Sequence, residues 1–151
     1  MKFICDCMLG TLAKWLRILG YDTLFFPYAR DDFLIKLAEK GERILLTKDR
    51  ELAESFEKSY FVKSEKLERQ LCEVIKSFSL KKREKSRCSV CNGELEKLNK
   101  DEIRNLVPYY VFQTQETFFR CKNCGKIYWK GTHVEKIERF IEKVYQDMDC
   151  E

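Results

Sequence analysis

Two cysteine pairs in the last third of the chain have the spacing of a metal site. Cys88 and Cys91 form one Cys-x-x-Cys pair, and Cys121 and Cys124 form the other. Zn²⁺ prefers four soft ligands in a tetrahedron, and each Cys-x-x-Cys turn can direct two thiolates at one ion. Disulfide pairs or thioredoxin-like redox pairs are disfavoured because neither motif lies at a strand-to-helix junction of a βαβ pattern. The spacing therefore predicts one structural zinc site with four thiolate ligands.

Four aspartates form a second group that could do chemistry, because they follow predicted strands. Asp6 directly follows an apolar segment, Asp31 and Asp32 lie in the loop after the next segment, and Asp49 follows the third. Ligands of an open parallel sheet collect outside the carboxyl ends of its strands, so these four carboxylates are expected at one edge. Asp22 precedes its strand and is expected at the opposite edge.

Clustered carboxylates repel one another, so their arrangement is favourable mainly when a hard divalent cation lies between them. Mg²⁺ or Mn²⁺ suits ligands that are all oxygen, and such a site can activate water and offset charge on a phosphodiester. The pattern therefore predicts hydrolysis of nucleic acid. In the alternative, Asp31, Asp32 and Asp49 are only helix N-caps, a role that aspartate performs without any chemistry.

The segments around these aspartates alternate between apolar runs and amphipathic stretches. Four predicted strands share short apolar sequences, and they lie at residues 2–5, 23–26, 43–47 and 60–62. Gly20 and Gly41 are expected to end the first two helices, and Ser64 to cap the last one. Four strands separated by helices predict an α/β domain with a parallel four-stranded sheet, right-handed crossovers and the strand order 2-1-3-4.

The cysteine pairs divide the chain into parts. Residues 1–80 form the predicted α/β domain, residues 81–87 a basic linker, and residues 88–151 a zinc ribbon with a C-terminal helix. Within the ribbon, residues 109–112 and 117–120 are expected to pair as a hairpin that leads into the second cysteine pair. The helix is expected from about residue 133, where apolar residues recur at helical spacing.

The formal net charge of +4 is concentrated in the linker. Its basic side chains are Lys81, Lys82, Arg83, Lys85 and Arg87. A basic segment beside a zinc ribbon could contact a phosphate backbone, because each neutralised phosphate releases condensed counterions. The alternative is a solvated hinge. No apolar run approaches the length of a bilayer span and no signal-peptide pattern is present, so the protein is expected in the cytoplasm, without a membrane partner.

Four blocks of the chain combine into a more specific pattern. They are DCMLG at residues 6–10, LAKWLR at 12–17, LGYD at 19–22 and ILLTKDR at 44–50. Together with the cysteine pairs and IYWKGTH at 127–133, they resemble the Mut-seven C-terminal RNase family, a branch of the PIN-like nucleases with a zinc ribbon. The resemblance implies a PIN-like three-layer domain that cleaves RNA with a divalent metal. Asp6 and Asp49 match motif aspartates, the middle acid stays open between Asp31 and Asp32, and Glu51 is the nearest candidate for a fourth.

Four cations near these aspartates in the sequence are candidate ligands of the scissile phosphate. Lys14 and Arg17 lie on the helix after the first aspartate, and Lys48 and Arg50 bracket Asp49. They could hold a phosphate or balance the carboxylates. A buried structural role explains Arg17 equally well.

The preferred hypothesis is a metal-dependent ribonuclease whose zinc ribbon assists RNA binding. Two alternatives stay open, a non-catalytic RNA-binding adaptor with structural carboxylates and a toxin-like nuclease regulated by a protein partner. His133, the only histidine, is expected to pack within the zinc module rather than act as a base, because four thiolates already saturate the metal.

Overall fold

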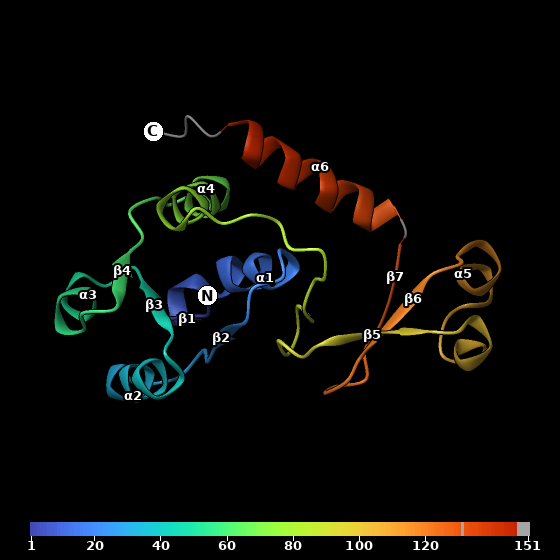
Figure 1. The fold of residues 1–151 in the computed structure, drawn as a ribbon, viewed down its shortest axis with the longest axis horizontal. Helices are drawn as coiled ribbons and strands as arrows, with labels where there is room; N and C mark the ends of the chain where they lie inside the picture. The colour runs from blue at the N-terminus through green and yellow to red at the C-terminus, as the bar shows by residue number, and fades with distance from the viewer. Residues whose placement is uncertain (131, 148–151) are drawn as a thin grey trace.

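The computed structural model describes residues 1–130 and 132–147, with only the backbone of residues 132–134. Its N-terminal body contains a parallel sheet with the order β2-β1-β3-β4 (Figure 1). The strands are β1 (Phe3–Cys5), β2 (Thr23–Phe25), β3 (Ile44–Thr47) and β4 (Ser59–Phe61). The predicted α/β class, the four parallel strands and their order are confirmed.

Helices follow each of these strands. They are α1 (Gly10–Ile18), α2 (Asp31–Gly41), α3 (Arg50–Ser55) and α4 (Leu67–Phe78), and a 3-10 turn, η1 (Cys7–Leu9), precedes α1. Gly20 follows α1 with a φ of +98°, as predicted for a C-terminal glycine. The predicted cap at Ser64 is wrong, because α4 begins at Leu67 with Lys66 as its N-cap. The Ser64 amide instead donates a hydrogen bond to the Glu73 carboxylate at 2.8 Å.

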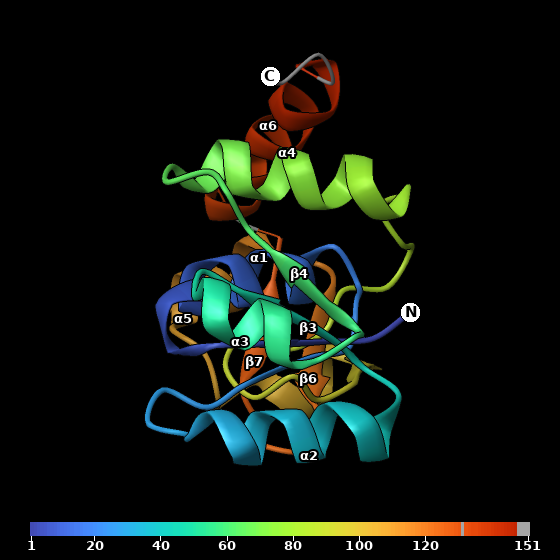
Figure 2. The same ribbon diagram turned by 90° about the vertical axis from the view of Figure 1, so that its left-hand side faces the viewer.

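Helices cover both faces of this sheet. Side chains alternate along β1, so Phe3 and Cys5 pack with α1 and α4, whereas Ile4 packs with α2 and α3. Figure 2 shows α2 on one side of the sheet and α4 on the other. Burial on both faces explains why the two central strands, β1 and β3, are almost wholly apolar.

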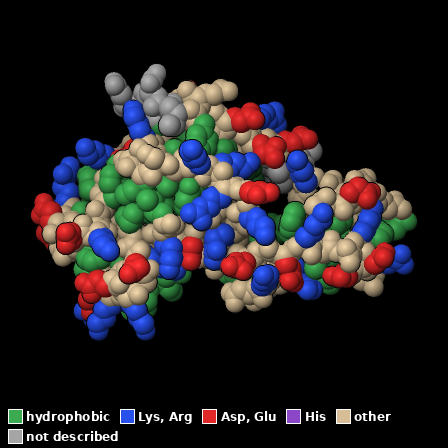
Figure 3. All heavy atoms as spheres, in the orientation of Figure 1, with side chains coloured by type: hydrophobic (Ala, Val, Ile, Leu, Met, Phe, Trp, Pro, Cys, Tyr) green, Lys and Arg blue, Asp and Glu red, His purple; other side chains and the backbone are tan. Residues whose placement is uncertain are grey.

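The basic linker, residues 81–87, is bound to the end of α1. The amides of Arg83 and Arg87 donate to the carbonyls of Leu19 and Arg17, at 2.9 and 2.8 Å. These backbone bonds fix the path of the linker, so it is not a free hinge. Lys and Arg side chains spread over the middle of the molecule, where the linker joins its two parts (Figure 3). The exposed cations of the linker are Lys81, Lys82, Arg83 and Lys85.

The zinc ribbon contains a second sheet, which is antiparallel with the order β5-β6-β7. Its strands are β5 (Leu95–Leu98), β6 (Phe118–Cys121) and β7 (Ile127–Trp129). A 3-10 turn, η2 (Lys100–Ile103), and a short helix, α5 (Tyr109–Thr114), lie between β5 and β6. Residues from all these elements form a small core of their own, which contains Leu98, Ile103, Val111, Phe118 and Trp129.

The predicted hairpin is wrong in its first half, because residues 109–112 belong to α5. The helix begins after Pro108, whose carbonyl accepts a hydrogen bond from the Phe112 amide at 3.0 Å. Val111 is buried, whereas Tyr109 and Tyr110 are exposed. The two tyrosines therefore face solvent, whereas Val111 and Phe112 pack on the core of the ribbon, so tertiary packing outweighs the strand propensity of these aromatic residues.

The last helix, α6 (Thr132–Gln146), runs back from the ribbon to the N-terminal body (Figure 1). Ile141 and Val144 join the main core of that body, and the Phe140 ring lies against Trp15 of α1 with ring centroids 4.4 Å apart. The predicted helix is present, and it completes the core of the α/β part rather than that of the ribbon. No helix in the described part of the chain combines the length and apolar character that a membrane span requires.

Candidate functional site

The Asp6 carboxylate lies at the carboxyl end of β1 and is only 5 % exposed. Its Oδ1 accepts a hydrogen bond from the Met8 amide at 2.9 Å. Its Oδ2 accepts from the Lys48 amide at 3.0 Å and from the hydroxyl of Thr47. An ionised carboxylate offers about four lone-pair sites, so these three donors hold Asp6 in one orientation and leave one site open.

Thr47, the last residue of β3, connects Asp6 to Asp49. Its side chain is fully buried, and its Oγ1 accepts from the Asp49 amide at 2.9 Å while its hydroxyl donates to Asp6. Sequence reasoning did not identify Thr47. The available signal was one hydroxyl at the end of an otherwise apolar strand, directly before two charged residues.

Asp49 is the N-cap of α3. Its Oδ1 accepts from the amides of Glu51 and Leu52, at 2.9 and 3.4 Å. The capping role that sequence analysis left open is therefore present, and neither bond uses Oδ2. Glu51, the candidate fourth acid, is an exposed residue of the same helical turn.

Asp31 and Asp32 are exposed residues in the first turn of α2, where Arg30 rather than either aspartate is the N-cap. Asp32 forms an ion pair with Arg30 at 3.5 Å. Among the residues that the structure describes, the four cysteines are the one group of three or more His, Cys, Asp or Glu placed to hold a metal ion. The aspartates thus share the carboxyl edge of the sheet without forming a tight cluster.

Two of the four candidate phosphate ligands are held by other partners. The Lys48 ammonium lies 2.9 Å from the Ser64 carbonyl oxygen and 3.1 Å from the Glu65 carboxylate, so it binds the loop after β4. Arg17 is buried and donates to the carbonyl oxygens of Thr23 at 2.9 Å and Ser89 at 3.0 Å. Arg17 therefore has the structural role that sequence analysis allowed.

The other two cations are exposed. Lys14 lies on the outer side of α1. The Arg50 guanidinium lies over the Phe61 ring, 4.5 Å from its centroid, at the carboxyl end of β4. Both therefore remain accessible to a phosphate. The side chain of His133 lies outside the described residues.

The four cysteines of the ribbon converge on one point. Their Sγ atoms all lie within 4.8 Å of one another. The Sγ atoms of Cys88 and Cys124 are 3.7 Å apart, and those of Cys91 and Cys121 are 3.4 Å apart. Tetrahedral zinc with Zn–S bonds of about 2.3 Å separates its sulfurs by about 3.8 Å. The donor set therefore fits Zn²⁺ in both chemistry and spacing.

The groups around the four sulfurs also favour metal binding. A Cβ on Gly93 would lie 2.6 Å from the Cys121 Sγ, so only glycine fits beside the site. The amides of Asn123 and Cys124 both point at the Cys121 Sγ at 3.4 Å. The Tyr128 hydroxyl lies 3.0 Å from the Cys88 Sγ. These donors would stabilise thiolate ligands.

Crowding of the sulfurs separates their pKa values. A hydrogen bond from the Asn123 side chain lowers the pKa of Cys91 to about 6. The Lys126 amide favours a Cys124 thiolate, but desolvation and the neighbouring sulfurs outweigh it and raise the pKa of Cys124 to about 11. Thiolates this close repel one another, and Zn²⁺ would supply the positive charge that offsets the repulsion.

The first zinc turn is joined to the N-terminal body by a second polar network. Asn92, buried in the turn, accepts a hydrogen bond from the Thr23 amide at 2.9 Å and donates to the Asp22 carboxylate at 2.6 Å. Asp22 also pairs with Arg43 at 2.8 Å and with Arg87 at 4.0 Å. Burial opposes ionisation of Asp22, but these donors prevail and lower its pKa. The ribbon is therefore docked on the edge strand β2 and on α1.

The arrangement defines an α/β protein with acidic residues at the carboxyl edge of its sheet and a tetrathiolate centre in an attached ribbon. The chain matches the family described as the Mut7-C RNAse domain over residues 1–141, and it belongs to that family. The family points to a nuclease that acts on RNA. Neither a curated protein nor a solved structure matches the chain.

Proposed function

We propose that the protein is a metal-dependent ribonuclease whose active site lies at the carboxyl edge of the parallel sheet. Asp6 and Asp49 would bind Mg²⁺ or Mn²⁺, together with Asp31 or Asp32. The observation that carries this proposal is the buried carboxylate of Asp6. Burying a charge is unfavourable unless it is paired, and the partners of Asp6 are two amides and the hydroxyl of Thr47.

The donor set suits a hard cation. Asp6 keeps one open lone-pair site, and Asp49 keeps its Oδ2, while the hydrogen bonds through Thr47 fix the two residues relative to each other. Carboxylate oxygens are the ligands that Mg²⁺ prefers, and it keeps several waters when few are supplied. When bound, such a cation lowers the pKa of a coordinated water and offsets charge on the phosphodiester.

The exposed cations would attract the RNA backbone. Lys14 and Arg50 would guide the strand toward the acidic edge, and the four exposed cations of the linker would extend the track toward the ribbon. Because the linker backbone is bound to α1, these charges would form a fixed surface rather than a mobile tail.

A non-catalytic RNA-binding adaptor is the second candidate. The specific observation in its favour is that the aspartates of the described chain do not form a preassembled metal-binding group. In that case Asp6 and Asp49 would serve only to fix the ends of β1 and α3.

Cleavage of end-labelled single-stranded and hairpin RNA by the zinc-loaded protein, with Mn²⁺ or Mg²⁺, tests the proposal. Asp6→Asn should reduce product at least 100-fold, because it removes the buried negative charge. Asp101→Asn, an exposed acid of the ribbon, is the matched control and should stay within twofold. Thermal unfolding of Asp6→Asn would exclude loss of the fold as the cause. RNA binding without metal-dependent product from the wild type would favour the adaptor.

A further inference from the structure

The carboxyl edge of the sheet exposes large apolar side chains beside the aspartates. Tyr28 is 96 % exposed, Phe33 is 46 % exposed, and Met8, two residues after Asp6, is 64 % exposed. Single exposed apolar residues are ordinary, but several gathered at one functional edge indicate a contact surface. Tyr28 and Phe33 belong to the loop after β2 and to the first turn of α2.

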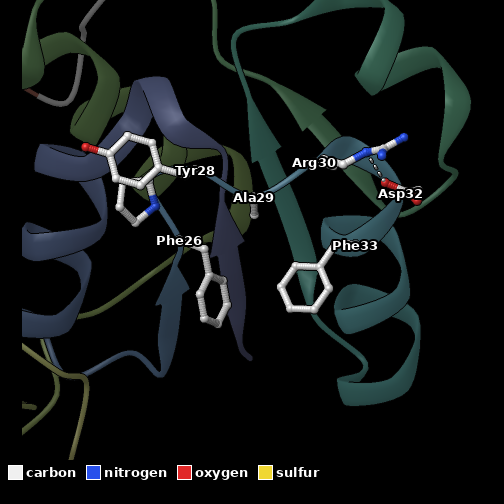
Figure 4. A pocket seen from close by; sticks show the side chains of 7 residues that line it. Phe26, Tyr28, Ala29, Arg30, Asp32 and Phe33 are labelled. Atoms are coloured by element: carbon white, nitrogen blue, oxygen red, sulfur yellow. Dashed lines mark ion pairs between the residues drawn. The ribbon is translucent and has the colours of Figure 1, made fainter.

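These aromatic residues border a shallow, open hollow of about 500 Å³. Its lining residues come from the loop after β2 and the start of α2, and they are Phe26, Pro27, Tyr28, Ala29, Arg30, Asp32 and Phe33. Figure 4 shows this loop crossing from Tyr28 to Arg30, with the Phe26 and Phe33 rings on one side of it. The two rings meet edge to face with centroids 5.6 Å apart.

One side of the hollow is fixed by packing against the core. Phe26 packs against the buried cluster that contains Ile4 and Leu34, so its ring is anchored in the core. Phe33 leans on that anchored ring, whereas Tyr28 has no ring partner among the described residues. An aromatic surface with one anchored ring and one open face is suited to receive another planar group.

The register of the sheet places the hollow next to the buried carboxylate. Cys5 of β1 pairs with Phe25 of β2 in parallel register. The next residues along the two strands are Asp6 and Phe26, so they leave the sheet at the same edge, on chains about 4.8 Å apart. A group in the hollow would therefore have its neighbouring atoms close to Asp6.

One cation of the hollow is available to a phosphate. Arg30 forms an ion pair with Asp32 at 3.5 Å, and its side chain is 87 % exposed. Exposed ion pairs contribute little, so the guanidinium can exchange the carboxylate for a phosphate oxygen at small cost. An aromatic surface beside an exchangeable arginine is the chemistry of single-stranded nucleic acid binding.

We propose that this edge binds unpaired nucleobases of a single-stranded RNA, which stack separately on the exposed rings of Tyr28 and Phe33, and so presents the adjacent phosphodiester to Asp6. The inference rests on the proposed ribonuclease function and names its substrate class. A base within an A-form helix has both faces covered by its neighbours, so it has no face free for the tyrosine. The site would therefore prefer single strands, loops or bulges to duplex RNA.

Binding of a short fluorescein-labelled single-stranded RNA to the Asp6→Asn protein, followed by anisotropy, separates recognition from cleavage. Tyr28→Ala and Phe33→Ala should each weaken binding about 5- to 100-fold, as expected for loss of one stacking partner. Tyr28→Phe keeps the ring and should stay within twofold. Tyr110→Ala, at another exposed tyrosine on α5, is the control and should also stay within twofold.

A second RNA with one abasic nucleotide identifies the stacked base. As the abasic nucleotide is moved along the strand, the loss of affinity caused by Tyr28→Ala should vanish at one position. At that position the RNA lacks the base that would stack on Tyr28. Equal losses at all positions, unchanged affinity of Tyr28→Ala, or no measurable binding by the Asp6→Asn protein would each overturn the inference. Circular dichroism would verify that Tyr28→Ala and Phe33→Ala keep the fold.

The two proposals can fail separately. Asp6-dependent cleavage that is insensitive to Tyr28 and Phe33 would leave the ribonuclease standing and remove the base site. Tyr28-dependent binding without cleavage by the wild type would support the base site and remove the enzyme.

Discussion

Asn92→Gly should loosen the docking of the zinc ribbon on the N-terminal sheet without adding backbone strain. Asn92 adopts a left-handed conformation with a φ of +72°, which glycine also tolerates. The substitution removes the acceptor of the Thr23 amide and the donor to Asp22. It also removes the acceptor of a 3.3 Å hydrogen bond from Arg87 Nε, and glycine adds about 0.5–1 kcal/mol of unfolded-chain entropy to the effect.

The magnitude follows from the burial of each partner. The Thr23 amide lies in a buried contact, and leaving it without an acceptor costs about 1–3 kcal/mol. Asp22 retains Arg43 at 2.8 Å, so loss of the Asn92 donor adds only about 1 kcal/mol. The free energy of unfolding should fall by about 2–4 kcal/mol, which for a chain of this size lowers the Tm by roughly 4–16 °C.

Two measurements check the prediction. Urea unfolding of the zinc-loaded protein gives the change in free energy, and amide hydrogen exchange gives the protection of the Thr23 amide. Asn92→Ala should be about 1 kcal/mol less stable than Asn92→Gly, because alanine tolerates a positive φ poorly.

Asn123→Ala is the matched control, since Asn123 lies in the other zinc turn and donates to the Cys91 Sγ at 3.4 Å. It should perturb the zinc site while the Thr23 amide stays protected. Unchanged exchange at Thr23 in Asn92→Gly, or a destabilisation below about 0.5 kcal/mol, would refute the docking role.

Two further predictions concern the N-terminal body. Burial opposes ionisation of Glu73, but the Ser64 amide and the Tyr60 hydroxyl prevail and hold its pKa below the ordinary value of 4.5. The stabilisation by the ionised Glu73 carboxylate is thus complete above pH 4.5 and is lost as the pH falls through the folded pKa. Glu73→Gln should therefore make the free energy of unfolding depend less on pH below 4.5, as measured by urea unfolding. Gly20→Ala should lower stability by about 2 kcal/mol or more, measured the same way, because its φ is +98° and its Cβ would lie 2.6 Å from the Arg83 Cβ.

The fold of residues 1–80 could be predicted because its signals are local. Each strand is a short apolar run, and each crossover is an amphipathic stretch, so alternation alone fixes a parallel sheet. The positions of Asp6 and Asp49 could then be predicted as well, since they lie one and two residues after the ends of β1 and β3. The convergence of the four cysteines on one point was equally predictable, because the Cys-x-x-Cys spacing suits two ligands of one metal ion.

Contacts between distant parts of the chain could not be predicted. Arg17 and Lys48 carry the positive charge that a phosphate-binding residue needs. Only the fold reveals that their side chains already donate hydrogen bonds to backbone carbonyl oxygens. Asp22 was rightly placed at the amino end of β2, but its partner Asn92 lies 70 residues away. The helix at Tyr109–Thr114 was missed because aromatic and β-branched residues favour a strand, whereas Val111 and Phe112 here pack on the ribbon core from a helix.

Because α6 packs on the N-terminal body, the core of that body cannot be completed until α6 has been synthesised. When α4 leaves the ribosome, the Trp15 side of the body still lacks the helix that covers it. Translation must continue from Phe78 to beyond Thr132, which takes on the order of 3–10 s at ~5–20 residues per second. A nascent chain would expose this apolar surface throughout that interval.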